Sequence, residues 1–309
     1  MKSAVLFIIF RREDTTKRVF ERIREAKPPR LYIAADGPRK DRRDEIEKCK
    51  AARHVVENVD WPCEVHRLYH DENLGCGVGP STAITWFFQN EEQGIILEDD
   101  ILPHIDFFRY CDELLDRFKE DKRIHIISGF NFFYNGFESD VSYYLTNFGS
   151  IWGWASWRRV WETFSYDVNV YPKEELYGKI KKRLPSRTAK HYCNYYKIMK
   201  NKRKDIWDFQ FALNRFFYDR YAITSYTNMV ENIGLGGENS THVSFNPTIS
   251  AHKAYSPYPL IHPDPISFDE KADEETIKMA NIYKPTILEK IFNKTIRLKR
   301  KLMQAFVGC

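Results

Sequence analysis

The sequence has no apolar run long enough to cross a membrane. A transmembrane helix needs about 20 apolar residues, whereas the only N-terminal run, Ala4 to Phe10, is followed at once by the charged residues 11–14. That run is also too short to serve as a signal peptide. We therefore expect a cytoplasmic protein in which residues 4–10 form a buried first strand.

Motifs for several common cofactors and metals are missing as well. The six cysteines occur without CxxC or any other metal-ligand spacing. This argues against a zinc site and a disulfide framework, and it favours a reducing compartment. The sequence has no GxGxxG spacing, so a nicotinamide dinucleotide site is not expected. Internal repeats and low-complexity tracts are absent too.

Composition and charge narrow the class further. Hydrophobic residues make up 43% and charged residues 29%, which is typical of a globular protein, whereas 15% aromatic residues is high. The net charge is only +5, and we place the excess of basic residues near the C-terminus. This pattern predicts local attraction to anionic surfaces and no nucleic-acid binding.

Residues 1–129 alternate short apolar runs with helical patterns, as in a mainly parallel sheet flanked by helices. The predicted strands are Ala4–Phe10, Leu31–Ala35, Glu64–Tyr69, Gly94–Glu98 and Ile124–Ser128. The predicted helices are Thr15–Ala26, Arg42–Asn58, Gly79–Gln89 and Asp106–Lys119. The fold class is therefore α/β, with a Rossmann-like first half.

The remaining residues divide into two parts. Residues 130–245 are rich in aromatic side chains, with a basic helical stretch around Lys179–Lys204 and a helix from about Trp207, and we assign them to the acceptor side. Together with residues 1–129 they form one predicted domain, 1–245. Residues 246–309 are predicted to be an extended segment followed by a basic amphipathic helix. Its residues 287–307 either contact an anionic membrane from the cytoplasmic side or pack on the domain.

The most informative motif is an apolar strand that ends in Glu98, Asp99 and Asp100. Three adjacent carboxylates repel one another, so they need a cation or hydrogen-bond donors, and oxygen ligands favour Mg²⁺ or Mn²⁺. Such an ion can bridge a diphosphate. Because side chains alternate along a strand, we assign Asp100 to the metal, and Glu98 and Asp99 to the ribose or sugar of a nucleotide-sugar donor or to support of the site. The alternative is a solvated acidic turn.

Two further segments are predicted to bind the same donor. Asp36 and Arg39 follow the second strand, where Asp36 could accept from a base or a ribose; the alternative is a simple turn. Asn73 and Gly75 belong to a glycine-rich loop that opens a helix, where the backbone can approach an anionic ligand closely.

The second half supplies three more candidates. Asp208, beside a tryptophan at the start of a helix, is the predicted catalytic base, or it merely caps that helix. Trp154, in a Trp- and Gly-rich stretch, is predicted to contact the donor, or it packs in the core. His242 ends a flexible loop that could close over the phosphates, and it is a second candidate metal ligand, or it is structural.

Taken in order, these segments resemble a known family. The elements are Asp36 after its strand, Asn73-Leu74-Gly75, Glu98-Asp99-Asp100, the stretch Trp152–Trp157, Trp207-Asp208, and the residues from Asn232 to His242. The sequence is similar to GT-A-fold nucleotide-sugar glycosyltransferases of bacterial family-2 type, which build polysaccharide or lipopolysaccharide. It is more distantly similar to the N-acetylglucosaminyltransferase I group, whose members carry a membrane anchor that this sequence lacks.

The resemblance implies specific roles and an activity. Asp100 would bind Mn²⁺, Asp36 the base, and Asp208 would act as catalytic base with inversion at the anomeric carbon. The predicted function is sugar transfer from a nucleotide-diphosphate sugar, with UDP favoured, to a hydroxyl of a saccharide or lipid-linked saccharide. The alternatives are a sugar-phosphate nucleotidylyltransferase and a catalytically silent carbohydrate-binding protein of the same fold. The nucleotidylyltransferase would need a glycine-rich loop after the first strand, where this sequence has residues 11–14.

Overall fold

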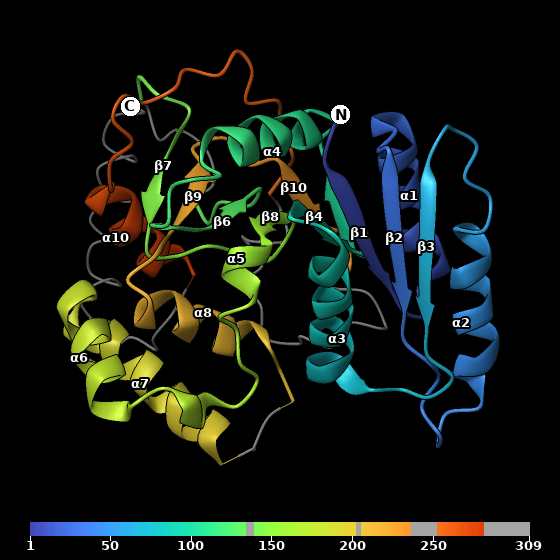
Figure 1. The fold of residues 1–309 in the computed structure, drawn as a ribbon, viewed down its shortest axis with the longest axis horizontal. Helices are drawn as coiled ribbons and strands as arrows, with labels where there is room; N and C mark the ends of the chain where they lie inside the picture. The colour runs from blue at the N-terminus through green and yellow to red at the C-terminus, as the bar shows by residue number, and fades with distance from the viewer. Residues whose placement is uncertain (134–138, 202–204, 236–251, 281–309) are drawn as a thin grey trace, which may run out of the picture.

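A mixed sheet of eight strands runs through the centre of the molecule, with helices packed against it (Figure 1). The computed structural model describes residues 1–133, 139–201, 205–235 and 252–280. The strand order is β3-β2-β1-β4-β8-β6-β9-β7. The sheet confirms the predicted fold class, a mixed and mainly parallel α/β sheet flanked by helices. Among the residues described, no helix has the length and apolar character needed to cross a membrane.

The first four strands are parallel and carry the ends that build the site. They are β1 (Ala4–Ile9), β2 (Arg30–Ala35), β3 (Glu64–Tyr69) and β4 (Gln93–Glu98). Strand β1 is almost entirely apolar and buried, as expected for a parallel strand covered on both faces. The connecting helices are α1 (Glu13–Ala26), α2 (Asp44–Val55) and α3 (Gly75–Asn90), and α4 (Asp106–Arg117) comes after β4 in the chain. All of these elements were predicted, with bounds that differ by at most a few residues.

Four more strands complete the large sheet. The sequence predicted β6 (Ile124–Ser128) but not β7 (Tyr143–Thr146), β8 (Trp154–Trp157) or β9 (Tyr221–Ser225). Strand β8 lies between β4 and β6 and is antiparallel to both. The Trp-rich stretch is therefore a central strand, and both halves of the predicted domain share one sheet.

A small second sheet holds the turn after β4. Strand β5 (Ile101–Pro103) pairs antiparallel with β10 (Val230–Asn232), and the Ile233 amide donates to the Asp100 carbonyl at 2.8 Å. Because β5 follows Asp100 directly, this pairing fixes the backbone of the acidic turn. The predicted lid begins near Ile233. From residue 236 to residue 251 it lies outside the part of the chain that the structure describes.

Helices of the second half form a layer beside the β6–β9–β7 end of the sheet (Figure 1). They are α5 (Arg158–Trp161), a 3₁₀ turn (Val168–Val170), α6 (Lys173–Arg183), α7 (Ser186–Lys200) and α8 (Asp208–Phe217). Helices α6, α7 and α8 pack together around their own apolar cluster, which includes Leu176, Ile180 and Leu213. The predicted basic helix is therefore two helices, separated near Pro185.

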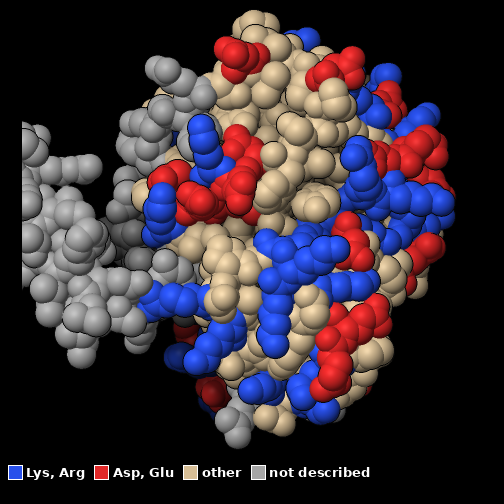
Figure 2. Space-filling model, turned by 90° about the vertical axis from the view of Figure 1, so that its left-hand side faces the viewer, with Lys and Arg blue, Asp and Glu red and all other residues tan. Residues whose placement is uncertain are grey.

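The surface of this layer is strongly basic. Figure 2 shows Lys and Arg side chains gathered on the lower part of the face that carries α6 and α7. Lys181, Lys182 and Lys190 are exposed there, and α7 contains no acidic residue. The basic charge is thus not confined to the C-terminal segment. The predicted amphipathic helix at 287–307 lies outside the described residues.

A buried aspartate anchors the last described helix, α10 (Glu270–Met279), which was not predicted within the segment 246–309. Asp273 is 5% exposed and accepts hydrogen bonds from the Thr146 hydroxyl and from Asn147, whose Nδ2 lies at 2.8 Å. Burial raises the pKa of Asp273 to about 6, although these hydrogen bonds oppose the shift.

We expect Asp273 to make stability fall with rising pH. A carboxyl group whose pKa is higher in the folded than in the unfolded state stabilises the protein below its unfolded pKa of 3.8, and this contribution is lost as pH rises to about 6. The shift corresponds to about 3 kcal/mol. In Asp273→Asn this pH-dependent step should disappear, so the stability deficit of the variant should be larger at pH 4 than at pH 7.

Urea unfolding at both pH values measures this difference. The matched control is Glu274→Gln, an exposed neighbour on the same helix, which should change stability by less than about 0.5 kcal/mol. A deficit of Asp273→Asn that is equal at the two pH values would contradict the prediction.

Candidate active site

Three carboxylates follow β4 at the carboxyl edge of the sheet. Glu98 is the last residue of the strand, and Asp99 and Asp100 form the turn into β5. Asp99 is 6% exposed and accepts hydrogen bonds from the Phe10 amide (3.1 Å) and from Arg12 Nη1 (3.3 Å). Arg12 Nη1 also donates to Asp100 Oδ2 at 2.6 Å. Arg12 therefore joins the end of β1 to two of the three acids.

The three acids are crowded, and two of them hold protons more strongly than usual. Burial and the charges of Asp100 and Asp99 raise the pKa of Glu98 to about 8. Burial and the charge of Asp100 raise the pKa of Asp99 to about 7, although Arg12 opposes this shift. The acidic motif is therefore no solvated turn, because Asp99 is buried and Glu98 and Asp100 are only partly exposed.

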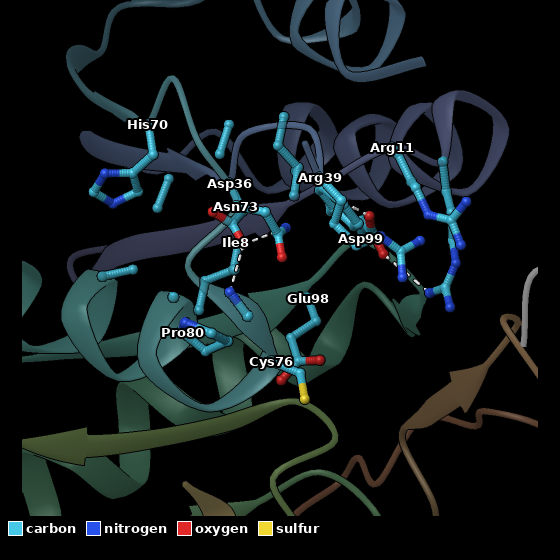
Figure 3. Close-up of a pocket in the computed structure, with 18 of the residues that line it drawn as sticks. Ile8, Arg11, Asp36, Arg39, His70, Asn73, Cys76, Pro80, Glu98 and Asp99 are labelled. Atoms are coloured by element: carbon cyan, nitrogen blue, oxygen red, sulfur yellow. Dashed lines mark hydrogen bonds and ion pairs between the residues drawn. The ribbon is translucent and has the colours of Figure 1, made fainter. Parts of the chain in front are cut away.

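A cavity of about 400 Å³ lies beside the acids (Figure 3). Its walls come from the carboxyl ends of β1, β2 and β4, from the loop after β3 and the start of α3, and from one residue ahead of α8. This volume is within the range of small-molecule sites, and the edge where strands end is where α/β sheets bind ligands. Six of the predicted donor-binding residues line the cavity: Asp36, Arg39, Asn73, Gly75, Glu98 and Asp99.

Asp100 itself does not line this cavity and reaches it through Arg12, which does. The Asp100 side chain is 15% exposed, and it packs directly against Gly234, where an added Cβ would overlap its carboxylate. The predicted metal ligand therefore lies between the cavity and the start of the predicted lid.

The residues fit one mode of metal binding. The described part of the chain holds no group of three or more His, Cys, Asp or Glu placed to form a complete metal site. Mg²⁺ bound together with substrate phosphates needs only one or two protein carboxylates, and phosphates and water supply the other ligands. Asp100 is partly exposed beside the cavity, which suits this mode. His242, the other predicted ligand, lies outside the described residues.

Asp36 holds the loop that follows β3. Its carboxylate accepts hydrogen bonds from the amides of Gly37, Leu74 and Gly75, and from Asn73 Nδ2 at 2.8 Å. Burial raises the pKa of Asp36, whereas these backbone donors lower it. Four donors occupy most of the lone pairs of a carboxylate. Asp36 and Asn73 thus fix the shape of the glycine-rich loop, which leaves little capacity for a base or ribose.

Arg39 contributes positive charge at the other side of the cavity. Its Nε donates to Glu45 Oε2 at 3.0 Å, and Arg11 Nη1 lies 3.2 Å from the second oxygen of Glu45. The Glu45 side chain is only 1% exposed, so it orients both guanidinium groups. Arg11 and Arg39 both line the cavity, where they could attract an anionic ligand.

Asp208 lies close enough to Glu98 for its charge to act on it, although it does not line the cavity. It is exposed and begins α8, and its charge is one of the causes that raise the pKa of Glu98. Burial is the main cause of the raised pKa of Cys76, and the charges of Asp205, Asp208 and Glu98 raise it further. In Figure 3 Cys76 and Glu98 lie close together in the cavity wall. The fold therefore brings the predicted base near the predicted donor site.

The predicted donor contact of Trp154 is wrong. Its side chain is 0% exposed and packs against Trp161, Trp207 and Phe211. Strand β8 places it inside the core, where no ligand can reach it. It packs on Trp207, which precedes Asp208 and is 3% exposed.

Sequence reasoning missed Arg11, Arg12, His70, Cys76 and Asp205 as cavity residues. A signal existed for the two arginines, because they follow β1 and the carboxyl ends of parallel strands share one edge. For Asp205, which is distant in sequence, no comparable signal existed.

Neither protein-family models nor curated proteins match the chain. Several solved structures are similar in part. A UDP-glucose pyrophosphorylase is 9% identical over 75% of this chain and 93% of its own, with a TM-score of 0.39. A UTP-bound UGPase from Acinetobacter baumannii is 7% identical over 75% and 89%, with a TM-score of 0.35. HddC from Yersinia pseudotuberculosis is 12% identical over 41% and 57%, with a TM-score of 0.26.

The names of the two pyrophosphorylases correspond to the predicted alternative, nucleotidyl transfer, and not to glycosyl transfer. Similarity at these identities and TM-scores carries no argument about activity. The function has to be argued from the cavity and its acids.

Proposed function

We propose that the protein is a metal-dependent glycosyltransferase that moves a sugar from a nucleotide-diphosphate sugar to a hydroxyl group. The observation that carries the proposal is the set of carboxylates beside the cavity: Asp100 in the turn after β4, and Asp208 at the start of α8 near Glu98. An acceptor hydroxyl is a poor nucleophile until a base removes its proton. Asp208 would take that proton, and inversion at the anomeric carbon would follow.

The other residues of the site would bind the donor. Arg11 and Arg39 lie where they can meet negative charge, and the loop held by Asp36 shapes the wall next to them. A divalent ion held by Asp100 would neutralise the charge of the departing nucleoside diphosphate. Glu98 and Asp99 remain candidates for the ribose or sugar hydroxyls. A saccharide or lipid-linked saccharide is the proposed acceptor, and polysaccharide or lipopolysaccharide synthesis the proposed setting.

Nucleotidyl transfer, the activity in the name of the similar UDP-glucose pyrophosphorylase, is the second candidate. Two features of the chain oppose it. Strand β1 leads through residues 10–12 straight into α1, with no glycine-rich phosphate loop. A sugar phosphate would also bring its negative charge toward Glu98, Asp205 and Asp208, and as an anionic nucleophile it needs no base.

Product analysis with purified protein distinguishes these activities. We expect nucleoside diphosphate to be released from one member of a panel of UDP-, GDP- and dTDP-sugars, only when Mn²⁺ or Mg²⁺ is present. Release of pyrophosphate from a nucleoside triphosphate and a sugar 1-phosphate would instead establish nucleotidyl transfer. Donor binding without either product would indicate the silent carbohydrate-binding alternative. The same panel read by thermal shift identifies the donor, because a ligand that binds only the folded state raises its apparent stability.

A further inference from the structure

Asp205 connects the donor cavity to the helix that carries Asp208. Of the described residues that line the cavity, Asp205 is the only one that comes after Asp99 in the sequence. It lies three residues before Asp208, the first residue of α8. Contacts that hold Asp205 in place therefore also hold the start of that helix in place relative to the donor.

Asp205 is held by contacts from two distant segments. The Tyr166 hydroxyl donates to Asp205 Oδ1 at 2.6 Å, and Cys76 Sγ lies 2.8 Å from the Asp205 carbonyl oxygen. Tyr166 lies between α5 and α6, and Cys76 lies in the first turn of α3. Asp205 is thus bound both to residues 1–129, through Cys76, and to residues 130–245, through Tyr166.

The Asp205 carboxylate packs closely against two glycines, although the residue is exposed on its other side. Gly75 has φ +89°, a conformation that favours glycine, and a Cβ added there would overlap Asp205 Oδ2. A Cβ added at Gly77 would overlap Asp205 Oδ1 and the Tyr166 hydroxyl, and would lie 2.8 Å from the Ile206 amide nitrogen. Glycine at positions 75 and 77 therefore leaves the space that the Asp205 carboxylate occupies. From the sequence we expected only that the backbone of this loop approaches a ligand closely.

The other side of the segment is fixed by the core. Trp207 is 3% exposed and packs against Trp154 and Trp161. Between the glycine seat and the tryptophan core, the backbone from Asp205 to Asp208 has little freedom to shift. Displacement of a catalytic group by about 1 Å can reduce a rate by about a hundredfold.

We propose that Asp205 is a positioning residue that holds Asp208 in register with the bound donor. The inference rests on the proposed glycosyl transfer. Its carboxylate, seated on Gly75 and Gly77 and bound by Tyr166, fixes the start of α8 without taking part in proton transfer. Asp205 and Asp208 thus have separate roles, although both are carboxylates beside the same cavity.

Four variants test this role. Asp205→Ala removes the carboxylate and Gly77→Ala displaces it. Each variant should lower kcat by about ten- to a hundredfold while the Kd for the donor changes less than threefold. Tyr166→Phe, which loses only the hydroxyl, should lower kcat severalfold. Asp205→Asn keeps an oxygen that can accept from Tyr166 and should retain most of the kcat. The matched control is Gly178→Ala on α6, where an added Cβ meets nothing within 4 Å; it should leave kcat unchanged.

Three kinetic results would overturn the proposal. If Asp205→Asn is as inactive as Asp208→Asn, Asp205 is itself the base. If Asp205→Ala matches the wild type, the contact has no role in turnover. If Asp205→Ala loses donor affinity in proportion to kcat, the residue only binds donor.

Hydrogen exchange tests the same idea without catalysis. Amides of residues 206–212 should exchange several times faster in Asp205→Ala and Gly77→Ala than in the wild type or Gly178→Ala. Unchanged exchange would overturn the proposal whatever the activity. A wild-type protein that releases no nucleoside diphosphate but shows this exchange pattern would refute the proposed function and leave the structural role of Asp205 intact.

Discussion

Asp208→Asn should lower kcat by about a hundred- to ten-thousandfold and leave donor binding unchanged. The substitution keeps the size of the side chain but removes its ability to take a proton, and general-base catalysis contributes about this much to a rate. Asp208 is exposed and does not line the donor cavity, so the donor should still bind. Steady-state kinetics together with a donor titration in the presence of Mn²⁺ measures both quantities.

The matched control for this variant is Asp116→Asn. The Asp116 side chain is 61% exposed and pairs with Lys2. Because Lys2 precedes β1 and Arg12 follows it, this pair lies at the opposite edge of the sheet from Arg12. This control should retain wild-type kcat and donor affinity. A kcat of Asp208→Asn equal to that of the wild type would end the assignment of Asp208 as base.

Asp100→Asn should remove the metal dependence of donor binding. The amide can still accept a hydrogen bond from Arg12 and fits beside Gly234, but it carries no charge to hold a cation. Because loss of residues that only support a metal ligand already costs about 10- to 100-fold in affinity, we expect at least this loss in donor affinity with Mn²⁺ present. The affinity of Asp100→Asn for the donor in the absence of metal should differ little from that of the wild type.

Thermal shift with donor, measured with Mn²⁺ and with a chelator, gives the comparison directly. The wild type and Asp116→Asn should be stabilised by donor only when the metal is present. The assignment of Asp100 fails if the variant keeps this difference. The cation would then bind elsewhere around the cavity, whose wall also contains Glu98 and Asp99.

The first half of the fold was predictable because its signals are local. Strands such as Ala4–Ile9 and Gln93–Glu98 are short apolar runs that end in charged residues, and each is followed by a helical pattern. The same locality placed Glu98 and Asp36 at one edge of the sheet. What it could not show is that Asp36 forms its hydrogen bonds with the loop after β3, because the partners are 37 to 39 positions away in the sequence.

The second half was harder for a physical reason. Strand β8 is only four residues long and contains two tryptophans, so its composition fits a sugar-binding surface as well as a core strand. Its place is decided by pairing with β4 and β6, which is tertiary information. Asp205 was missed for the same reason, because its partners Tyr166 and Cys76 are 39 and 129 positions away.

The place of β8 has a consequence for how the chain can be divided. Strand β4 is complete by Glu98, yet its antiparallel neighbour arrives only at Trp154–Trp157. A protein shortened to end near residue 129 would expose the backbone amides and carbonyls along the outer side of β4, and such an open edge invites association with other chains. During synthesis the edge of β4 therefore stays open until the tryptophan strand β8 has been made.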